Sequence, residues 1–242
     1  MTSSDRDTAR HPRYLYVRQR LAERIQSGAW RAGELIPSEF DIAHEFGVSQ
    51  GTARAAVAAL AAERIVARRQ GLGTFVYEHT PGEELSRFSC LFDHKQVRIN
   101  SGSRYGRVVR ASADRRERRR LRLGEGSKVL RIGRVRLRGS KPFVVEKISL
   151  PEALFRGLVD RAELPDSLYE LYQKAFGVLV VGVEERLSAV TAERSAATAL
   201  GIAIGTPLLR IERVAVALEG KPVELRVSLC YLADAHYLAR LK

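Results

Sequence analysis

Two arginines, Arg134 and Arg136, lie two positions apart in a segment where apolar and polar residues alternate as in a β-strand. Side chains two positions apart in a strand share a face, so these two guanidinium groups would repel each other unless they face solvent or an anion. Glu146, in the next extended segment, offers a carboxylate. The pattern leaves three interpretations open: solvent exposure, an internal arginine–glutamate ion pair, and a site for an anionic ligand.

Positive charge is concentrated in the middle of the chain. The 242 residues hold 41 Lys and Arg against 28 Asp and Glu, a formal net charge of +13. Residues 98–141 hold 16 Lys and Arg against three Asp and Glu, which equals the whole surplus. The run from Arg115 to Arg120 favours a solvated helix face, and a nucleic acid or another anionic partner is the alternative interpretation.

A second group of polar residues, Ser49, Gln50, Thr52 and Arg54, marks the exposed start of a predicted helix. Hydroxyl groups and the free amides of a helix start suit phosphate, and arginine suits phosphate or guanine. Residues 1–79 carry a net charge of only +2, so we expect modest DNA affinity and a weak dependence of that affinity on salt.

Three short helices and a hairpin would position these residues. An apolar stripe at helical spacing predicts a first helix that ends before Gly28; its members are Tyr14, Val17, Leu21 and Ile25. Ser38, with Asp41 three residues on, predicts the start of a second helix, and Ser49 predicts a third. Residues 65–77 alternate around a Gly-x-Gly turn, which predicts a hairpin. The whole is a winged helix, whose third helix would enter the major groove.

The motifs of this segment resemble the DNA-binding domain of GntR-family transcription regulators. They are Gly33-x-x-Ile36-Pro37-Ser38-Glu39, Phe46-Gly47-Val48-Ser49, Thr52-x-Arg54 and Arg68-Arg69-Gln70-Gly71-x-Gly73-Thr74-Phe75-Val76. The resemblance implies contacts with double-stranded operator DNA from Ser38, Ser49, Gln50, Thr52, Arg54, Arg68, Gln70, Gly71 and Gly73. Phe40 and Gln50 stand where the family usually has arginine, which implies a different operator sequence.

The rest of the chain contains an internal repeat. Residues 126–135 match residues 205–214 at an offset of 79, and Ser112 and Thr191, at the same offset, are predicted to cap one helix each. The repeated unit is helix, strand, turn, strand, which predicts a mainly antiparallel sheet with helices on one side. The chain is therefore expected to be α+β, with a flexible tail (1–11), a winged helix (12–79), a linker turning at Pro81-Gly82 (80–84) and a second domain (85–242).

This second domain resembles the UTRA domain, the effector-binding half of HutC-subfamily GntR regulators, whose fold is similar to that of chorismate lyase. The resemblance is carried by Arg131-x-x-Arg134-x-Arg136, Lys141-Pro142-x-x-x-Glu146, Ser167-Leu168-Tyr169 and Gly220-Lys221-Pro222-Val223-Glu224. It implies dimerisation and a pocket for a small anionic metabolite, formed by Arg134, Arg136, Glu146, Ser167, Tyr169 and Glu224, with Arg87 and Tyr231. Ser167 also starts a helix whose amides suit an anion, although a helix cap needs no ligand.

Several function classes lack support in the sequence. The longest apolar stretches are too short to span a membrane, and residues 1–13 lack the apolar core of a secretory signal. Cys90 and Cys230 show no metal-ligand or disulfide spacing, so we expect a cytoplasmic protein with no metal. Five scattered histidines indicate no general base, so no catalytic residues and no cofactor beyond an effector are expected.

The residues and the two resemblances together predict a homodimeric transcription regulator, a repressor, whose operator affinity changes when a metabolite binds. Two alternatives belong to other classes. One is a chorismate-lyase-like enzyme that uses Arg134 and Arg136 to hold carboxylates. The other is an architectural protein that coats DNA through the arginines of residues 115–120 and binds without sequence preference.

Overall fold

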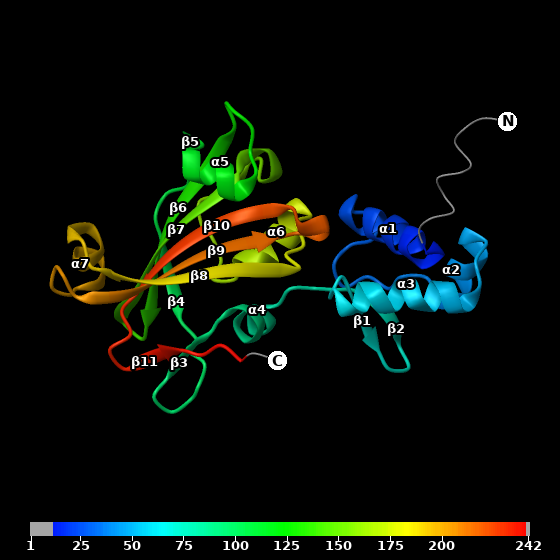
Figure 1. Cartoon of the computed structure of the whole chain (residues 1–242), viewed down its shortest axis with the longest axis horizontal. Coiled ribbons are helices and arrows are strands. Elements are labelled where there is room, and N and C mark those ends of the chain that lie inside the picture. Colours follow the sequence, from blue (N-terminus) through cyan, green and yellow to red (C-terminus); the bar gives the residue numbers. More distant parts are fainter. Residues whose placement is uncertain (1–11, 241–242) are drawn as a thin grey trace. The chain divides into compact units, whose positions relative to one another are not determined.

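The computed structural model describes residues 12–240. Between His79 and Thr80 the chain divides into two compact units, called unit 1 and unit 2 here and described separately (Figure 1). The tail expected at residues 1–11 lies outside the described residues. No helix within residues 12–240 is long and apolar enough to cross a membrane.

Unit 1 consists of three helices followed by a hairpin. They are α1 (Arg13–Gln26), α2 (Glu39–Phe46), α3 (Gln50–Ala62), β1 (Val66–Arg69) and β2 (Gly73–Val76). The stripe predicted for α1 is buried from Val17 onward, and α3 buries Ala53, Val57 and Leu60. The predicted winged helix-turn-helix is confirmed.

Local side-chain contacts start and stop the helices of unit 1. The Ser38 hydroxyl accepts a hydrogen bond from the amide of Asp41, whose carboxylate accepts one from the amide of Ser38, a reciprocal cap that starts α2. The Ser49 hydroxyl accepts from the amide of Thr52 at 3.2 Å and starts α3. Between them Gly47 adopts a left-handed conformation with φ of 59°, which ends α2.

The hairpin of unit 1 needs glycine at its turn. Gly71 and Gly73 have φ of 73° and 111°, in the region that side chains rarely adopt. A Cβ on Gly73 would lie 2.7 Å from Cδ1 of Leu35, which is closer than two carbon atoms approach. The segment before α2 therefore packs directly against the hairpin, where Leu35 pairs with Phe75.

Unit 2 contains four helices, nine strands and short 3-10 turns in its described part. In chain order they are α4 (Pro81–Phe88), β3 (Leu91–Asp93), β4 (Gly102–Tyr105), β5 (Val109–Ser112), α5 (Arg115–Leu121), β6 (Lys128–Arg138), β7 (Lys141–Pro151), α6 (Leu168–Phe176), β8 (Gly182–Thr191), α7 (Arg194–Leu200), β9 (Pro207–Val216), β10 (Pro222–Cys230) and β11 (Ala235–Tyr237). The 3-10 turns are Glu152–Leu154, Leu158–Asp160 and Leu218–Gly220.

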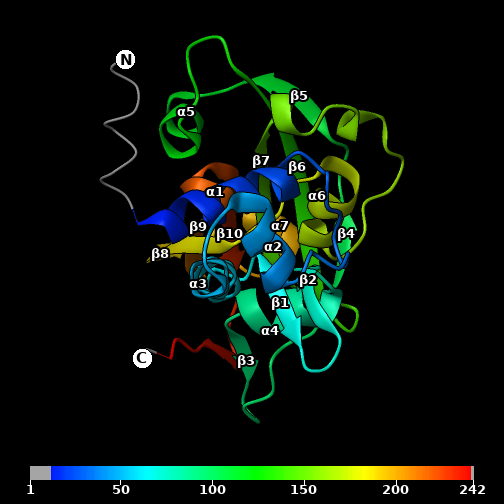
Figure 2. The same cartoon turned by 90° about the vertical axis from the view of Figure 1, so that its right-hand side faces the viewer.

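Seven strands form one antiparallel sheet in the order β4-β6-β7-β10-β9-β8, with β5 also paired to β6. The first copy of the repeated unit is α5-β6-β7 and the second is α7-β9-β10. The two copies join where β7 pairs with β10. Strands β3 and β11 form a separate ribbon, and Figure 2, like Figure 1, shows this ribbon and α5 on opposite sides of the large sheet. The predicted antiparallel sheet is confirmed.

Helices cover both faces of the sheet, whereas the sequence predicted helices on one side. Helix α6 packs through Tyr169 and Tyr172 on Leu130, Ile132 and Ile148; the face that carries these residues is called the α6 face below. The repeat helices α5 and α7 pack on the opposite face, against alternate residues such as those at positions 129, 145, 225 and 229. The repeat thus predicted the helices of one face only, because α6 lies outside the repeated unit.

Two expected helix starts lie two residues too early. Ser112 and Thr191 are the last residues of β5 and β8, and the caps are Asp114 and Glu193, which keep the offset of 79. The Asp114 carboxylate accepts from the amide of Glu117 at 2.8 Å, an interaction for which Ser112 lies too far back along the chain.

The linker expected at residues 80–84 is mostly helical, since α4 begins at Pro81. Proline suits the first position of a helix because the amide that it lacks would have no partner there. The carbonyl of Thr80 accepts from the amide of Glu84 at 2.9 Å, and its hydroxyl accepts from the amide of Glu83 at 3.3 Å. Pro81-Gly82 is therefore the first turn of a helix and not the expected loop.

The position of this cap yields a stability prediction for unit 2. We expect Asp114→Ala to lower the free energy of unfolding by about 1 kcal/mol, because the amide of Glu117 loses its acceptor. Ser112→Ala, the control, should change it by less than about 0.5 kcal/mol. Urea unfolding followed by far-UV circular dichroism measures both, and the fluorescence of Trp30, the single tryptophan, reports unit 1 separately. Equal losses in the two variants would contradict the assignment of the cap.

Candidate nucleic-acid and ligand sites

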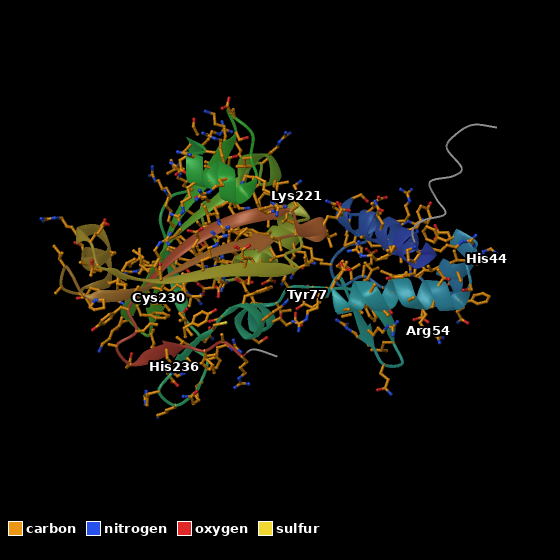
Figure 3. All side chains as sticks on the ribbon, viewed as in Figure 1. His44, Arg54, Tyr77, Lys221, Cys230 and His236 are labelled. Atoms are coloured by element: carbon orange, nitrogen blue, oxygen red, sulfur yellow. The ribbon has the colours of Figure 1, made fainter. Side chains whose placement is uncertain are left out.

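The polar residues expected to contact DNA lie on three neighbouring parts of unit 1. Ser49, Gln50, Thr52 and Arg54 occupy the cap and first turns of α3, and Figure 3 marks Arg54 on this helix. The Ser49 and Thr52 hydroxyls are 2.9 Å apart and hydrogen-bonded, so they present one hydroxyl cluster at the start of α3.

An open groove joins the start of α2 to the hairpin. Of the residues expected to contact DNA, the groove is lined by Ser38, Gln50, Arg68, Gln70, Gly71 and Gly73; Ser49, Thr52 and Arg54 are not among its lining residues. Phe40 lines the same groove and is 68% exposed, as are Leu72 at 67% and Leu35 at 55%.

Glu39 connects the helix to the hairpin, a role that the sequence did not predict. Its Oε2 accepts from Nε of Arg54 and its Oε1 from Nη2 of Arg68, both at 2.9 Å. One carboxylate therefore orients two arginines from different elements. The only available signal was its place directly after Ser38, which also fits an ordinary acidic first turn.

The arginine-rich helix α5 is largely engaged within unit 2. Arg116 and Arg120 both pair with Glu212 of β9, and Arg118 donates to the carbonyl of Ala113 at 2.9 Å. Arg115 and Arg119 point to solvent. These contacts argue against a DNA-coating surface, and the solvated-face interpretation fits Arg115 and Arg119.

Arg134 and Arg136 share the α6 face, as strand alternation predicted, yet their surroundings differ. Arg134 is 2% exposed, pairs with the Glu146 carboxylate and donates to the Tyr105 hydroxyl at 2.9 Å. Glu146 also accepts from the Ser228 hydroxyl at 2.8 Å. Burial alone would raise the pKa of Glu146, but Arg134 and Arg226 hold this pKa well below its usual range. Arg134 and Glu146 are therefore an internal ion pair.

Arg136 has no such carboxylate. Its Nε donates to the Ser101 hydroxyl at 2.7 Å, and no residue of the described chain forms an ion pair with it. Burial lowers the pKa of Arg136, and the positive charge of Arg134 lowers it further. A cation in this setting attracts any anion that can reach it.

Arg136 faces two adjoining hollows of about 70 and 30 Å³ on the α6 face. Of the expected effector-binding residues, Arg136, Glu146 and Ser167 line them. Arg213, Arg226, Ser101 and Glu84 also line them and were not predicted. The repeat carried a signal for Arg213, which is the counterpart of Arg134 at the offset of 79.

Tyr169 and Glu224 form a buried network next to these hollows. Glu224 is fully buried and accepts from the Tyr169 hydroxyl at 3.4 Å, the Tyr172 hydroxyl at 2.7 Å and Nη2 of Arg226 at 2.8 Å. Burial raises the pKa of Tyr169, so its hydroxyl stays protonated and donates. The network holds Arg226 in place, and neither Tyr169 nor Glu224 is among the residues that line the hollows.

Of the other residues expected to bind the effector, Ser167 lines the hollows, and Arg87 and Tyr231 do not. The Ser167 hydroxyl donates to Glu84 at 2.6 Å instead of capping α6. Arg87 donates to the carbonyl of Val181 and lies over the Phe88 ring. Tyr231 packs with the α7 cluster. The structure does not bring Arg87 or Tyr231 to the lining of the hollows.

The difference between the two strand arginines yields a prediction. We expect Arg134→Met to lower the free energy of unfolding of unit 2 by about 3 to 5 kcal/mol, because it leaves the Glu146 charge buried without its partner. Arg136→Met should change it by about 1 kcal/mol or less, since no ion pair is broken. The double variant Arg134→Met/Glu146→Met should recover part of the loss. Urea unfolding monitored by circular dichroism measures these values, and equal losses for the two arginines would contradict the assignment.

Comparison with known proteins agrees with this geometry. Residues 13–76 match the family described as bacterial regulatory proteins, gntR family, and residues 97–236 match the UTRA domain. The chain is 28% identical over 224 residues to the Escherichia coli K12 protein named "Probable fructoselysine utilization operon transcriptional repressor", with 90% of this chain and 89% of that protein covered.

Two further relatives extend the likeness. The histidine utilization repressor of Klebsiella aerogenes is 29% identical over 168 residues, which cover 66% of this chain and 64% of the repressor. A ligand-binding domain from Bordetella bronchiseptica, described as that of a GntR-family transcriptional regulator, is 31% identical with a TM-score of 0.61, and the match covers 64% of this chain and 98% of that domain. The chain is a DNA-binding transcription regulator and not an enzyme, and it belongs to the GntR family as a HutC-type member with a UTRA domain.

Proposed function

We propose that this regulator is a repressor whose operator affinity is controlled by a small anionic metabolite, bound in the hollows beside Arg136. The observation that supports this proposal is that the arginines lining these hollows differ in whether they have an ion-pair partner. Arg213 pairs with Glu185 at 2.6 Å and Arg226 with Glu224 at 2.8 Å, whereas Arg136 donates to the Ser101 hydroxyl and has no ion-pair partner within residues 12–240. A phosphate or carboxylate group would supply the missing negative charge.

In this proposal the winged helix of residues 12–79 is the DNA-binding domain. The hydroxyls of Ser49 and Thr52 and the amides at the start of α3 suit backbone phosphate, and Gln50 suits adenine in the major groove. The exposed ring of Phe40 suits apolar contact with a thymine methyl group at a position where arginine would read guanine. These contacts support a sequence preference that differs from that of arginine-bearing relatives.

The same proposal includes a homodimer in the cytoplasm, with residues 85–242 as the effector-binding and dimerisation domain. Two copies related by two-fold symmetry would place two recognition helices on a palindromic operator. Two of the relatives cited above are named repressors, which supports negative regulation. A metabolite would act by favouring one of two dimer arrangements, with a coupling of about 1 to 3 kcal/mol.

The test is operator binding by the purified protein on its own upstream promoter fragment at fixed salt, with a panel of phosphorylated and carboxylated metabolites. We expect specific binding that one compound releases. The Arg136→Met variant should bind the fragment normally. Its release from the fragment should need a concentration of that compound about tenfold higher or more, because a charge-assisted contact is lost. Arg119→Met, an exposed arginine of α5, is the charge-matched control. The proposal fails if a compound binds the protein tightly and leaves operator affinity unchanged.

The bridging carboxylate of Glu39 yields a prediction about salt. The single negative charge of Glu39 offsets one of the two positive charges of Arg54 and Arg68 in the free protein, so their contacts with phosphate release fewer counterions. We expect Glu39→Gln to steepen the slope of log affinity against log salt by about 1. Glu45→Gln, on the same helix but paired with Arg24, should leave the slope unchanged. Fluorescence anisotropy from about 50 to 200 mM KCl measures the slopes, and identical slopes in both variants would refute the prediction.

A further inference from the structure

A carboxylate of the protein itself lies at the start of α6. The Oε2 atom of Glu84 accepts from the Ser167 hydroxyl at 2.6 Å and from the backbone amide of Tyr169 at 3.2 Å. Glu84 belongs to α4, more than 80 residues earlier in the chain, and it takes the place that a side-chain cap from Ser167 would otherwise fill. A helix start with a hydroxyl beside it is a position that favours an anion.

This carboxylate is also one of two negative charges near the arginine without an ion pair; the other, Glu146, is already paired with Arg134. Glu84, Ser167 and Arg136 line the same hollow. Arg213 and Arg226, which line it as well, have Glu185 and Glu224 as ion-pair partners. Glu146, and to a smaller extent Glu84, counteract the lowering of the Arg136 pKa by burial. The side chain therefore provides to Arg136 and α6 what an anionic ligand would provide.

The size of the hollows points the same way. With Glu84 in place they measure about 70 and 30 Å³. Pockets that enclose metabolites usually measure about 300 to 1,000 Å³. Because the Glu84 carboxylate already accepts from Ser167 and from the Tyr169 amide, a ligand that binds these two donors takes its place.

The two halves of α4 are held in different ways. At its C-terminal end Phe88 is buried, its ring lies 5.1 Å from the Tyr169 ring, and its carbonyl accepts from Arg213. In its first turns the Glu84 carboxylate makes the contacts with α6. Helix α4 begins at Pro81, directly after the boundary at His79 that ends unit 1. Loss of the Glu84 contacts would free the end of α4 that leads to unit 1, while Phe88 stays anchored.

We propose, building on the function proposed above, that Glu84 is an internal counter-anion that occupies the anion subsite formed by Ser167 Oγ, the Tyr169 amide and Arg136. A phosphate or carboxylate group of the effector binds by displacing this carboxylate. The displacement releases the first turns of α4 and so transmits occupancy of the site to the DNA-binding unit. Glu84 is thus a competitor for the ligand and the element through which the ligand acts.

The test is titration of the full chain with inorganic phosphate by isothermal calorimetry at constant ionic strength. We expect Glu84→Ala to bind phosphate about tenfold or more tightly than the unmodified protein, because phosphate no longer competes with a resident carboxylate. Glu83→Ala is the matched control, since this exposed carboxylate of the same helix should leave the affinity unchanged. Adding Ser167→Ala to Glu84→Ala should abolish most of the gain. Glu84→Gln, which keeps the shape of the side chain, replaces Glu84→Ala if that variant does not fold.

A second measurement reports the release of α4. Phosphate should speed hydrogen–deuterium exchange of the amides of residues 83–88 in the unmodified protein and have little effect on them in Glu84→Ala. Equal phosphate affinity in Glu84→Ala and Glu83→Ala, or no binding to Glu84→Ala, overturns the internal counter-anion. These readouts need no operator, so failure of operator regulation would be seen separately: phosphate affinity would rise in Glu84→Ala while no metabolite releases the promoter fragment.

Discussion

Pairing of buried arginines with carboxylates across neighbouring strands is the constraint on which unit 2 depends. Arg134 lies directly opposite Glu146 in the β6–β7 ladder, and Glu146 lies opposite Ser228 in the β7–β10 ladder. A shift of the register by one residue would turn these charges to the opposite face and leave each without its partner. The ion pairs therefore specify the register, at a desolvation cost that a purely apolar face would not carry.

The duplicated unit separates what the sheet requires from what a ligand requires. Both copies of the unit have an arginine at the position of Arg134 and Arg213, and each of these arginines has a carboxylate partner. Arg136 corresponds to Ala215, which is fully buried in the core. The equivalent position of the second copy is thus filled by a small apolar side chain, so the sheet itself does not need a cation there. Arg136 is therefore the strand arginine that the sheet does not require, which agrees with the ligand-binding role proposed for it.

Sequence reasoning succeeded for most features that neighbours along the chain decide, apart from the caps expected at Ser112 and Thr191 and the loop expected at Pro81-Gly82. The caps at Ser38 and Ser49, the hairpin glycines and the alternating strands depend on residues a few positions apart, and all were predicted. It failed where contacts join distant segments. The contact of Glu84 with Ser167 joins residues 83 positions apart, and no periodic pattern in the sequence predicts it. Alternation placed Arg134 and Arg136 on one face, but it did not predict that α6 would cover that face.

In both units, arginines that we propose to bind an anionic partner lie beside a carboxylate of the protein itself. Glu39 holds Arg54 and Arg68 in unit 1, and Glu84 lies in the hollow of Arg136 in unit 2. An internal carboxylate lowers the affinity of the arginine for any other anion, because that anion must compete with the carboxylate. A ligand with further matching contacts recovers the loss, whereas a simple phosphate or a random DNA backbone does not. A chain with a net charge of +13 can in this way keep its arginines from binding anions without discrimination.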